Sequence, residues 1–146
     1  MTENQPVTIV MIEDDEGHAR LIEKNIRRAG ISNTIRHFAD GTSALEYLYQ
    51  HHDQPGFSGP ALILLDLNLP DMSGTDILAK IKSGSLKRTP VVVLTTTDDK
   101  VEIQRCYDLG CNVYITKPVN YESFAGAIRQ LGLFLSVIQV PDPVEE

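Results

Sequence analysis

The sequence predicts an α/β domain built on a parallel sheet, and two patterns support this prediction. Short apolar runs alternate with longer segments in which apolar residues recur every three or four positions, as in amphipathic helices. The runs 61–65 and 90–94 are almost wholly apolar, which is typical of strands covered on both faces of a parallel sheet. The five predicted strands lie near 7–12, 33–37, 61–65, 90–94 and 112–115.

The first two segments between the predicted strands have helical spacing. In the first, apolar residues at 19, 22, 26 and 29 lie on one face, and Gly30 follows as a typical C-terminal cap. The second predicted helix runs from Thr42 to about Gln50, with apolar residues at 44, 45 and 48. Each helix therefore has an apolar face that can pack against the sheet.

The other three helices are defined mainly by their ends. The third starts at 73–74, where Ser precedes Gly. The fourth starts after a Thr/Asp cluster, with Thr97 or Asp98 as its predicted N-cap, and ends at Gly110. The fifth is predicted over about 121–138, where apolar residues again form a stripe.

Length and composition indicate one folded domain. At 146 residues, with 42% hydrophobic and 23% charged residues, the chain is long enough for a normal core and unlike a disordered segment. We expect a core over about 7–138, a short Pro-rich acidic tail at 139–146, and no output domain. The net charge of −7 disfavours direct binding to nucleic acid or to an anionic membrane.

The sequence also bears on location and redox state. No apolar stretch reaches the ~20 residues that span a bilayer, and 1–6 lacks the basic and apolar regions of a signal peptide. The expectation is a cytoplasmic protein. Cys106 and Cys111 form neither a disulfide framework nor a metal motif, so both are predicted to be free thiols.

Polar residues follow four of the predicted strands, where each strand leaves the core. Acids at 13–15 follow the first strand, Asp66 follows the third, the threonines 95–97 follow the fourth, and Thr-Lys-Pro at 116–118 follows the fifth. The carboxyl ends of parallel strands meet at one edge, which is where α/β folds place their sites. Carboxylates, a hydroxyl and a lysine in one pocket suit a divalent metal and a phosphoryl group.

Each of these residues also has a purely structural interpretation. The acids at 13–15 are favoured at a helix N-terminus, Asp66 suits the turn that follows it, and the threonines 95–97 suit an N-cap. Lys117 is consistent with an ordinary loop residue. Tyr114, within the fifth strand, is consistent with a core residue.

Four motifs, taken in order, resemble the receiver domain of two-component response regulators. They are Ile-Glu-Asp-Asp (12–15), Leu-Leu-Asp-Leu-Asn-Leu-Pro-Asp-Met-Ser-Gly (64–74), Val-Val-Val-Leu-Thr-Thr (91–96) and Tyr-Ile-Thr-Lys-Pro (114–118). The resemblance covers about 7–138. It implies a flavodoxin-like (βα)5 doubly wound fold with strand order 2-1-3-4-5. The tail and Tyr-Ile-Thr-Lys-Pro-Val-Asn (114–120) look most like the stand-alone regulators that partner phytochrome-type histidine kinases.

The resemblance implies a role for each residue of the predicted pocket. Asp66 would accept a phosphoryl group from a sensor histidine kinase, and Thr95 and Lys117 would each contact a phosphoryl oxygen. Thr95 and Tyr114 would form a switch pair whose movement changes the surface of the fourth helix, fifth strand and fifth helix. Pro118 would follow a cis peptide that aims Lys117.

The resemblance also implies a Mg²⁺ site. Its implied ligands are Glu13 through a water, Asp14, Asp66 and the backbone carbonyl of Asn68. In related sequences the first acid directly follows the strand, so Glu13 and Asp14 are preferred to Asp15. Asn68 and Thr97 occupy the two positions that tune dephosphorylation in relatives, and neither brings a general base. We therefore expect slow self-dephosphorylation.

Two surfaces are predicted to contact partners. His18, one turn into the first helix, is predicted to be a surface residue near the site that contacts the kinase. The fifth helix has a second apolar stripe formed by Leu133, Phe134 and Val137. A helix that is apolar on more than one face usually buries both faces, so a homodimer through this region is favoured. The alternative is that the tail 139–146 covers the stripe.

Three classes of function remain to be compared. The first is a phosphorylation-driven signalling switch that does not turn over a substrate. The second is a Mg²⁺-dependent phosphatase of the haloacid dehalogenase type, which needs a second acid two residues after the nucleophile, where this chain has Asn68. The third is an inert adaptor, for which loss of Asp66 or Lys117 is expected, yet both are present. The sequence favours the switch.

Overall fold

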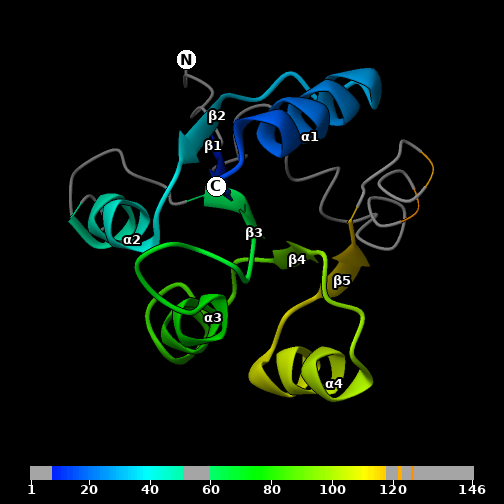
Figure 1. The fold of residues 1–146 in the computed structure, drawn as a ribbon. Helices are drawn as coiled ribbons and strands as arrows, with labels where there is room; N and C mark the ends of the chain where they lie inside the picture. Colours follow the sequence, from blue (N-terminus) through cyan, green and yellow to red (C-terminus); the bar gives the residue numbers. More distant parts are fainter. Residues whose placement is uncertain (1–7, 51–59, 118–121, 123–125, 127–146) are drawn as a thin grey trace, which may run out of the picture.

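The computed structural model describes residues 8–50, 60–117, 122 and 126, and within these the five predicted strands form one parallel sheet (Figure 1). The strands are β1 (Thr8–Ile12), β2 (Ile35–Phe38), β3 (Pro60–Leu65), β4 (Val91–Thr95) and β5 (Val113–Thr116). Their order across the sheet is β2-β1-β3-β4-β5, and each neighbouring pair is parallel. The predicted flavodoxin-like order is therefore confirmed.

Four helices lie in the described residues and connect the strands. They are α1 (Glu16–Arg28), α2 (Gly41–Gln50), α3 (Gly74–Ser83) and α4 (Lys100–Leu109). The helix predicted over 121–138 lies outside the described residues except at Glu122 and Gly126. Pro118 and the tail 139–146 lie outside them entirely.

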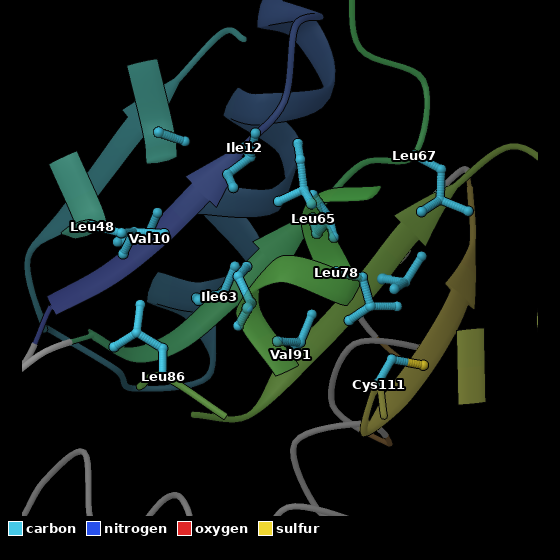
Figure 2. Packing of buried hydrophobic residues seen from close by; sticks show 14 of the residues in the cluster. Val10, Ile12, Leu48, Ile63, Leu65, Leu67, Leu78, Leu86, Val91 and Cys111 are labelled. Carbon is cyan, nitrogen blue, oxygen red and sulfur yellow. The ribbon is translucent and has the colours of Figure 1, made fainter. Parts of the chain in front are cut away.

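The sheet carries one apolar core on each face, because successive strand residues point to opposite sides. Ile9 and Met11 of β1 face α1 and pack in a cluster with Ile22. Val10 and Ile12 face the other helices, and Figure 2 shows this second cluster. The second cluster includes Leu48 from α2, Leu78 from α3 and Cys106 from α4. The sheet is therefore covered by α1 on one face and by α2, α3 and α4 on the other (Figure 1).

The helix ends agree with the sequence prediction except at the end of α1 and at the starts of α2 and α4. The C-cap of α1 is Ala29 rather than Gly30, which follows it with φ 87°, and α2 begins at Gly41, one residue before the predicted start. Ser73 caps α3, and Gly110 ends α4 in the left-handed conformation with φ 111°, as predicted. The N-cap of α4 is Asp99, so the prediction of 97–98 is wrong. Asp99 has an extended backbone, and its Oδ2 accepts a hydrogen bond from the backbone N–H of Glu102 at 3.3 Å. That side chain satisfies one of the unpaired donors of the first helical turn.

Strand β2 begins at Ile35, two residues later than the start predicted at residue 33. The carbonyl of Asn33 accepts a hydrogen bond from Nη1 of Arg27 at 2.8 Å, so a side chain of α1 engages the chain just before the strand. The first sheet bond in this region runs from the N–H of Ile9 to the carbonyl of Thr34 at 2.8 Å. The chain therefore joins the sheet only after this turn.

Two predictions about the whole chain can be compared with the described residues. Within them, no helix combines the length and apolar character that crossing a bilayer requires. Cys106 and Cys111 are buried free thiols, as predicted.

Candidate functional site

The predicted polar residues meet at the carboxyl edge of the sheet. Glu13 and Asp14 follow β1, Asp66 follows β3, Thr95 ends β4, and Lys117 follows β5. The backbone holds the edge together, because the N–H of Asp66 donates to the carbonyl of Ile12 at 3.0 Å and the N–H of Lys117 donates to the carbonyl of Thr95 at 2.7 Å. Strand order thus gathers residues that are more than 100 positions apart in the chain.

Three carboxylates form an acidic cluster at this edge. Glu13, Asp14 and Asp66 each offer one oxygen, and these oxygens lie within 4.8 Å of one another. Glu13 and Asp66 are buried, while Asp14 is exposed. Asp15 serves a different purpose, since its Oδ1 accepts from the backbone N–H of His18 at 3.0 Å and caps α1. The structure therefore brings Glu13 and Asp14, the two acids preferred from the sequence, next to Asp66.

Lys117 lies among these acids and is almost fully buried. Its Nζ donates to Oε1 of Glu13 at 2.6 Å and lies 3.4 Å from Oδ2 of Asp66. Burial raises the pKa of Glu13, and the nearby charge of Asp66 adds to that rise, whereas the hydrogen bond from Lys117 opposes it. Three carboxylates against one ammonium leave a net negative site, and a hard cation with oxygen ligands, such as Mg²⁺, suits that donor set.

The loop after β3 is anchored on Asp66. The N–H of Asn68 donates to Oδ1 of Asp66 at 3.1 Å, and its Nδ2 donates to Oγ1 of Thr95 at 3.3 Å. Asn68 also forms an isolated antiparallel bridge with Ser73, which folds the loop back on itself. Asn68 therefore touches both the predicted phosphoacceptor and the predicted switch threonine, so these predicted site residues form one connected group.

A cavity of about 630 Å³ lies beside this group. Asp14 and the loop residues 67–73 line it. The acidic cluster thus borders open space, through which a cation or a small phosphoryl donor can approach. Thr95, in contrast, is fully buried.

Tyr114 is half-buried and is held by two polar contacts. Its hydroxyl donates to the carbonyl of Thr97 at 2.7 Å, and its N–H donates to the hydroxyl of Tyr107 on α4 at 3.1 Å. Burial raises the pKa of Tyr114 to about 12. Its ring packs against the cluster on the α2–α4 face. Tyr114 therefore links β5 to the loop before α4 and to α4 itself.

The predicted dimer residues Leu133, Phe134 and Val137 lie outside the described residues.

His18 is more closely involved with the site than the sequence suggested. Its side chain is 39% exposed, but its Nδ1 lies 3.1 Å from Nζ of Lys117. The sequence offers a weak signal for this contact, because His18 lies one turn after the acids. Its partner, however, is 99 residues away and could be paired with it only by the fold.

Comparison with known proteins assigns the family. Residues 9–129 match the family described as "Response regulator receiver domain". The chain therefore belongs to the response regulator receiver domain family, as the motifs indicated.

Three relatives illustrate the breadth of the likeness. A solved response regulator receiver domain from Rhodospirillum rubrum is 66% identical, with a TM-score of 0.72, and the match covers 95% of this chain and all of that one. Response regulator Rcp1 from Synechocystis is 34% identical over 140 residues, covering 94% of this chain and 95% of Rcp1.

A crystal structure of the Mn²⁺-bound form of Rcp1 has a TM-score of 0.71 at 32% identity, and the match covers 96% of this chain and 100% of that one. The phosphorylated cyanobacterial phytochrome response regulator RcpA is 35% identical, with a TM-score of 0.74, and the match covers 97% of this chain and 100% of that one.

Proposed function

We propose that this receiver domain is a phosphorylation-driven switch in which Asp66 accepts a phosphoryl group from a sensor histidine kinase. The observation that carries the proposal is the position of the Asp66 carboxylate, which lies 3.4 Å from the Lys117 ammonium and has an oxygen within 4.8 Å of oxygens of two further acids. Such a carboxylate can attack a phosphorus atom while a cation balances the charge that accumulates around it.

In the proposed reaction, a carboxylate oxygen of Asp66 attacks the phosphorus of a phosphohistidine. An O–P bond forms on Asp66 and the P–N bond breaks with its electron pair going to the ring nitrogen. The other ring nitrogen of the phosphohistidine carries a proton, so the kinase histidine leaves as a neutral imidazole. Lys117 donates to one phosphoryl oxygen and the hydroxyl of Thr95 donates to another. The chain therefore positions the acceptor and stabilises charge, which is most of what phosphoryl transfer requires.

Mg²⁺ is the proposed cofactor. When bound, it would neutralise the carboxylates and the charge on the phosphoryl group. Glu13 through a water, Asp14, Asp66 and the carbonyl of Asn68 would hold it. The Mn²⁺-bound form of Rcp1 supports a divalent cation in a relative of this chain.

The proposed output is a change of the α4–β5 surface, together with the segment that follows β5. Thr95 would move toward the phosphoryl group, and Tyr114 would then exchange its present partners. Because Tyr114 hydrogen-bonds both Thr97, just before α4, and Tyr107, near the end of α4, its movement would break contacts at both ends of that helix. Asn68 and Thr97 supply no general base, so the phosphorylated state is expected to be long-lived.

The proposed partners follow from the relatives. RcpA is described as a phytochrome response regulator, which supports a phytochrome-type histidine kinase as the phosphoryl donor.

We further propose a single receiver domain in the cytoplasm that acts as a homodimer through Leu133, Phe134 and Val137. Sedimentation velocity is expected to show a dimer that Phe134→Asp converts to a monomer, and an unchanged dimer would remove that stripe from the interface.

Two other functions are less well supported. A phosphatase of the haloacid dehalogenase type needs an acid where this chain has Asn68, whose amide already hydrogen-bonds Thr95. An adaptor without phosphorylation would leave the acidic cluster and Lys117 without a chemical use. The switch is therefore preferred.

Phosphoryl uptake from acetyl phosphate, followed by intact-protein mass spectrometry, tests the proposal. With Mg²⁺ the wild type is expected to gain one phosphoryl group and Asp66→Asn none, while Asp76→Asn, which changes an acid on α3, behaves as the wild type. Chelation of Mg²⁺ is expected to abolish the gain. If neither acetyl phosphate nor a phosphorylated kinase modifies the wild type, the adaptor function replaces the switch.

A further inference from the structure

Among the described residues, three side chains lie around the ammonium of Lys117, and one of them is His18. The three atoms around Nζ are Oε1 of Glu13 at 2.6 Å, Nδ1 of His18 at 3.1 Å and Oδ2 of Asp66 at 3.4 Å. The contacts to Glu13 and His18 are hydrogen bonds and engage two of the three N–H donors of the ammonium, whereas the contact to Asp66 is an ion pair. The shortest contacts are to Glu13 and His18, and the longest is to the proposed phosphoacceptor.

The contact with Lys117 defines which ring nitrogen of His18 is the hydrogen-bond acceptor. A lysine ammonium donates and cannot accept, so Nδ1 of His18 must be the acceptor and the ring proton lies on Nε2. The carboxylates nearest to Nδ1 are Oε2 of Glu13 at 3.9 Å and Oδ2 of Asp15 at 4.0 Å, both beyond hydrogen-bond distance. Nδ1 of His18 therefore accepts from Lys117 rather than pairing with either acid.

The first turn of α1 holds the imidazole in place. The backbone N–H of His18 donates to Oδ1 of the cap residue Asp15, which fixes His18 at the third position of the helix. The N–H of Asp15 in turn donates to Oε2 of Glu13 at 3.2 Å. These hydrogen bonds connect His18, which accepts from Lys117, to the loop that carries Glu13 and Asp14.

We propose that His18 is a positioning residue for Lys117. Lysine is a compact charge on a flexible four-carbon stem, so its direction depends on the partners of its ammonium. With one N–H held by Glu13 and one by His18, the ammonium stays within ion-pair distance of the Asp66 carboxylate, where a phosphoryl oxygen would arrive. This inference rests on the proposed function, because it assigns His18 an effect on phosphoryl uptake at Asp66.

The test compares variants that remove the acceptor with one that keeps it. His18→Leu removes the acceptor and excludes water, and His18→Ala removes it with the smallest change to the helix. His18→Asn places its Oδ1 the same number of bonds from the backbone as Nδ1. Arg20→Leu is the matched control, because it puts a leucine on the exposed face of α1 away from the site.

The readout is the initial rate of phosphoryl uptake from acetyl phosphate with Mg²⁺. His18→Leu and His18→Ala are expected to slow uptake about three- to tenfold, the size of effect that loss of one typical hydrogen bond produces. His18→Asn is expected to restore the rate to within about twofold. Arg20→Leu is expected to match the wild type. Urea unfolding of each variant separates a change in rate from a loss of folded protein.

The outcomes distinguish this inference from the proposed function. If the wild type takes up phosphate on Asp66 but both removal variants are as fast, His18 does not position Lys117 and the proposed switch still stands. The same conclusion follows if His18→Asn is as slow as the removal variants, since a structural role gives no rescue by an acceptor. If the wild type takes up no phosphate, the proposed function fails, and this inference fails with it.

Discussion

At the scale of single residues, Gly74 controls how closely the loop after β3 can fold back on Asp66. A Cβ at this position would lie 2.4 Å from Cα of Leu67 and 2.7 Å from the carbonyl oxygen of Asp66. Both atoms belong to the backbone, so neither can move without shifting the loop that carries the candidate site. The requirement for glycine here comes from close approach, because Gly74 has no left-handed backbone.

Gly74→Ala is therefore expected to destabilise the fold by at least about 1–3 kcal/mol, the usual cost of overpacking a core. Gly41→Ala is the matched control, because its Cβ would meet the flexible ends of Ile77 and Met72 at 2.6 Å rather than backbone. Urea unfolding measures both free energies. Equal losses for the two variants would show that the backbone contact at Gly74 carries no special cost.

At the scale of elements, α2 is capped by two aspartates from different parts of the chain. Asp40 is local, and its Oδ1 accepts from the N–H of Ser43 at 2.7 Å. Asp71 belongs to the loop after β3, and its two oxygens accept from the N–H groups of Gly41 at 2.9 Å and Thr42 at 2.8 Å. The first three backbone donors of the helix are thereby satisfied, and α2 is joined to the loop that holds Asn68.

The cap by Asp71 is expected to make stability depend on pH in acid. Hydrogen bonds from Thr42 and Gly41 lower the pKa of Asp71 to about 2, below its ordinary value of 3.8. Because the folded-state pKa is the lower one, the stabilisation is fully present above about pH 4 and is lost as pH falls toward 2.

Asp71→Asn tests this dependence. The variant is expected to be less stable than the wild type at pH 6, and the difference is expected to shrink as pH falls below about 4. Urea unfolding at several pH values gives the difference, and Asp40→Asn provides the comparison with a local cap. A difference between wild type and Asp71→Asn that stays constant down to pH 2 would contradict the ionic cap.

At the scale of the whole molecule, the reactivity of the two thiols measures how well the packing of α4 against the sheet excludes solvent. Cys106 is fully buried and Cys111 is nearly so, and both belong to the core on the α2–α4 face. Burial raises the pKa of Cys106 to about 11 and that of Cys111 to about 12. At neutral pH both are therefore protonated and shielded from solvent.

Thiol reagents are expected to reach these cysteines only when the fold opens. In the native protein at pH 8, reaction with a chromogenic disulfide reagent is expected to be at least about 100-fold slower than in denaturing urea, because both burial and the raised pKa suppress the thiolate. The rate is followed by absorbance. Native thiols that react as fast as those of the unfolded chain would contradict the closed packing of α4 against the sheet.

Much of the architecture was predictable from local sequence. Apolar runs, helical spacing and the caps Ser73 and Gly110 depend on neighbouring residues, so the sequence predicts the strands and helices directly. The order of the strands in the sheet does not follow from these local patterns. The strand-end positions of Asp66, Thr95 and Lys117 also indicated one shared edge, and the structure brings them together there. The start of α4 was misassigned because three consecutive candidates, Thr97 to Asp99, have similar capping chemistry and only the backbone geometry selects one.

Tertiary structure alone decided the contacts that join distant segments. Three such contacts pair His18 with Lys117, Asp71 with the start of α2, and Tyr107 with β5. No periodicity or motif in the sequence indicated which two residues would pair. Each depends on where packing brings two elements to within hydrogen-bond distance. Periodicity and turn chemistry are properties of adjacent residues, whereas a contact across 99 positions exists only after the sheet has ordered its strands.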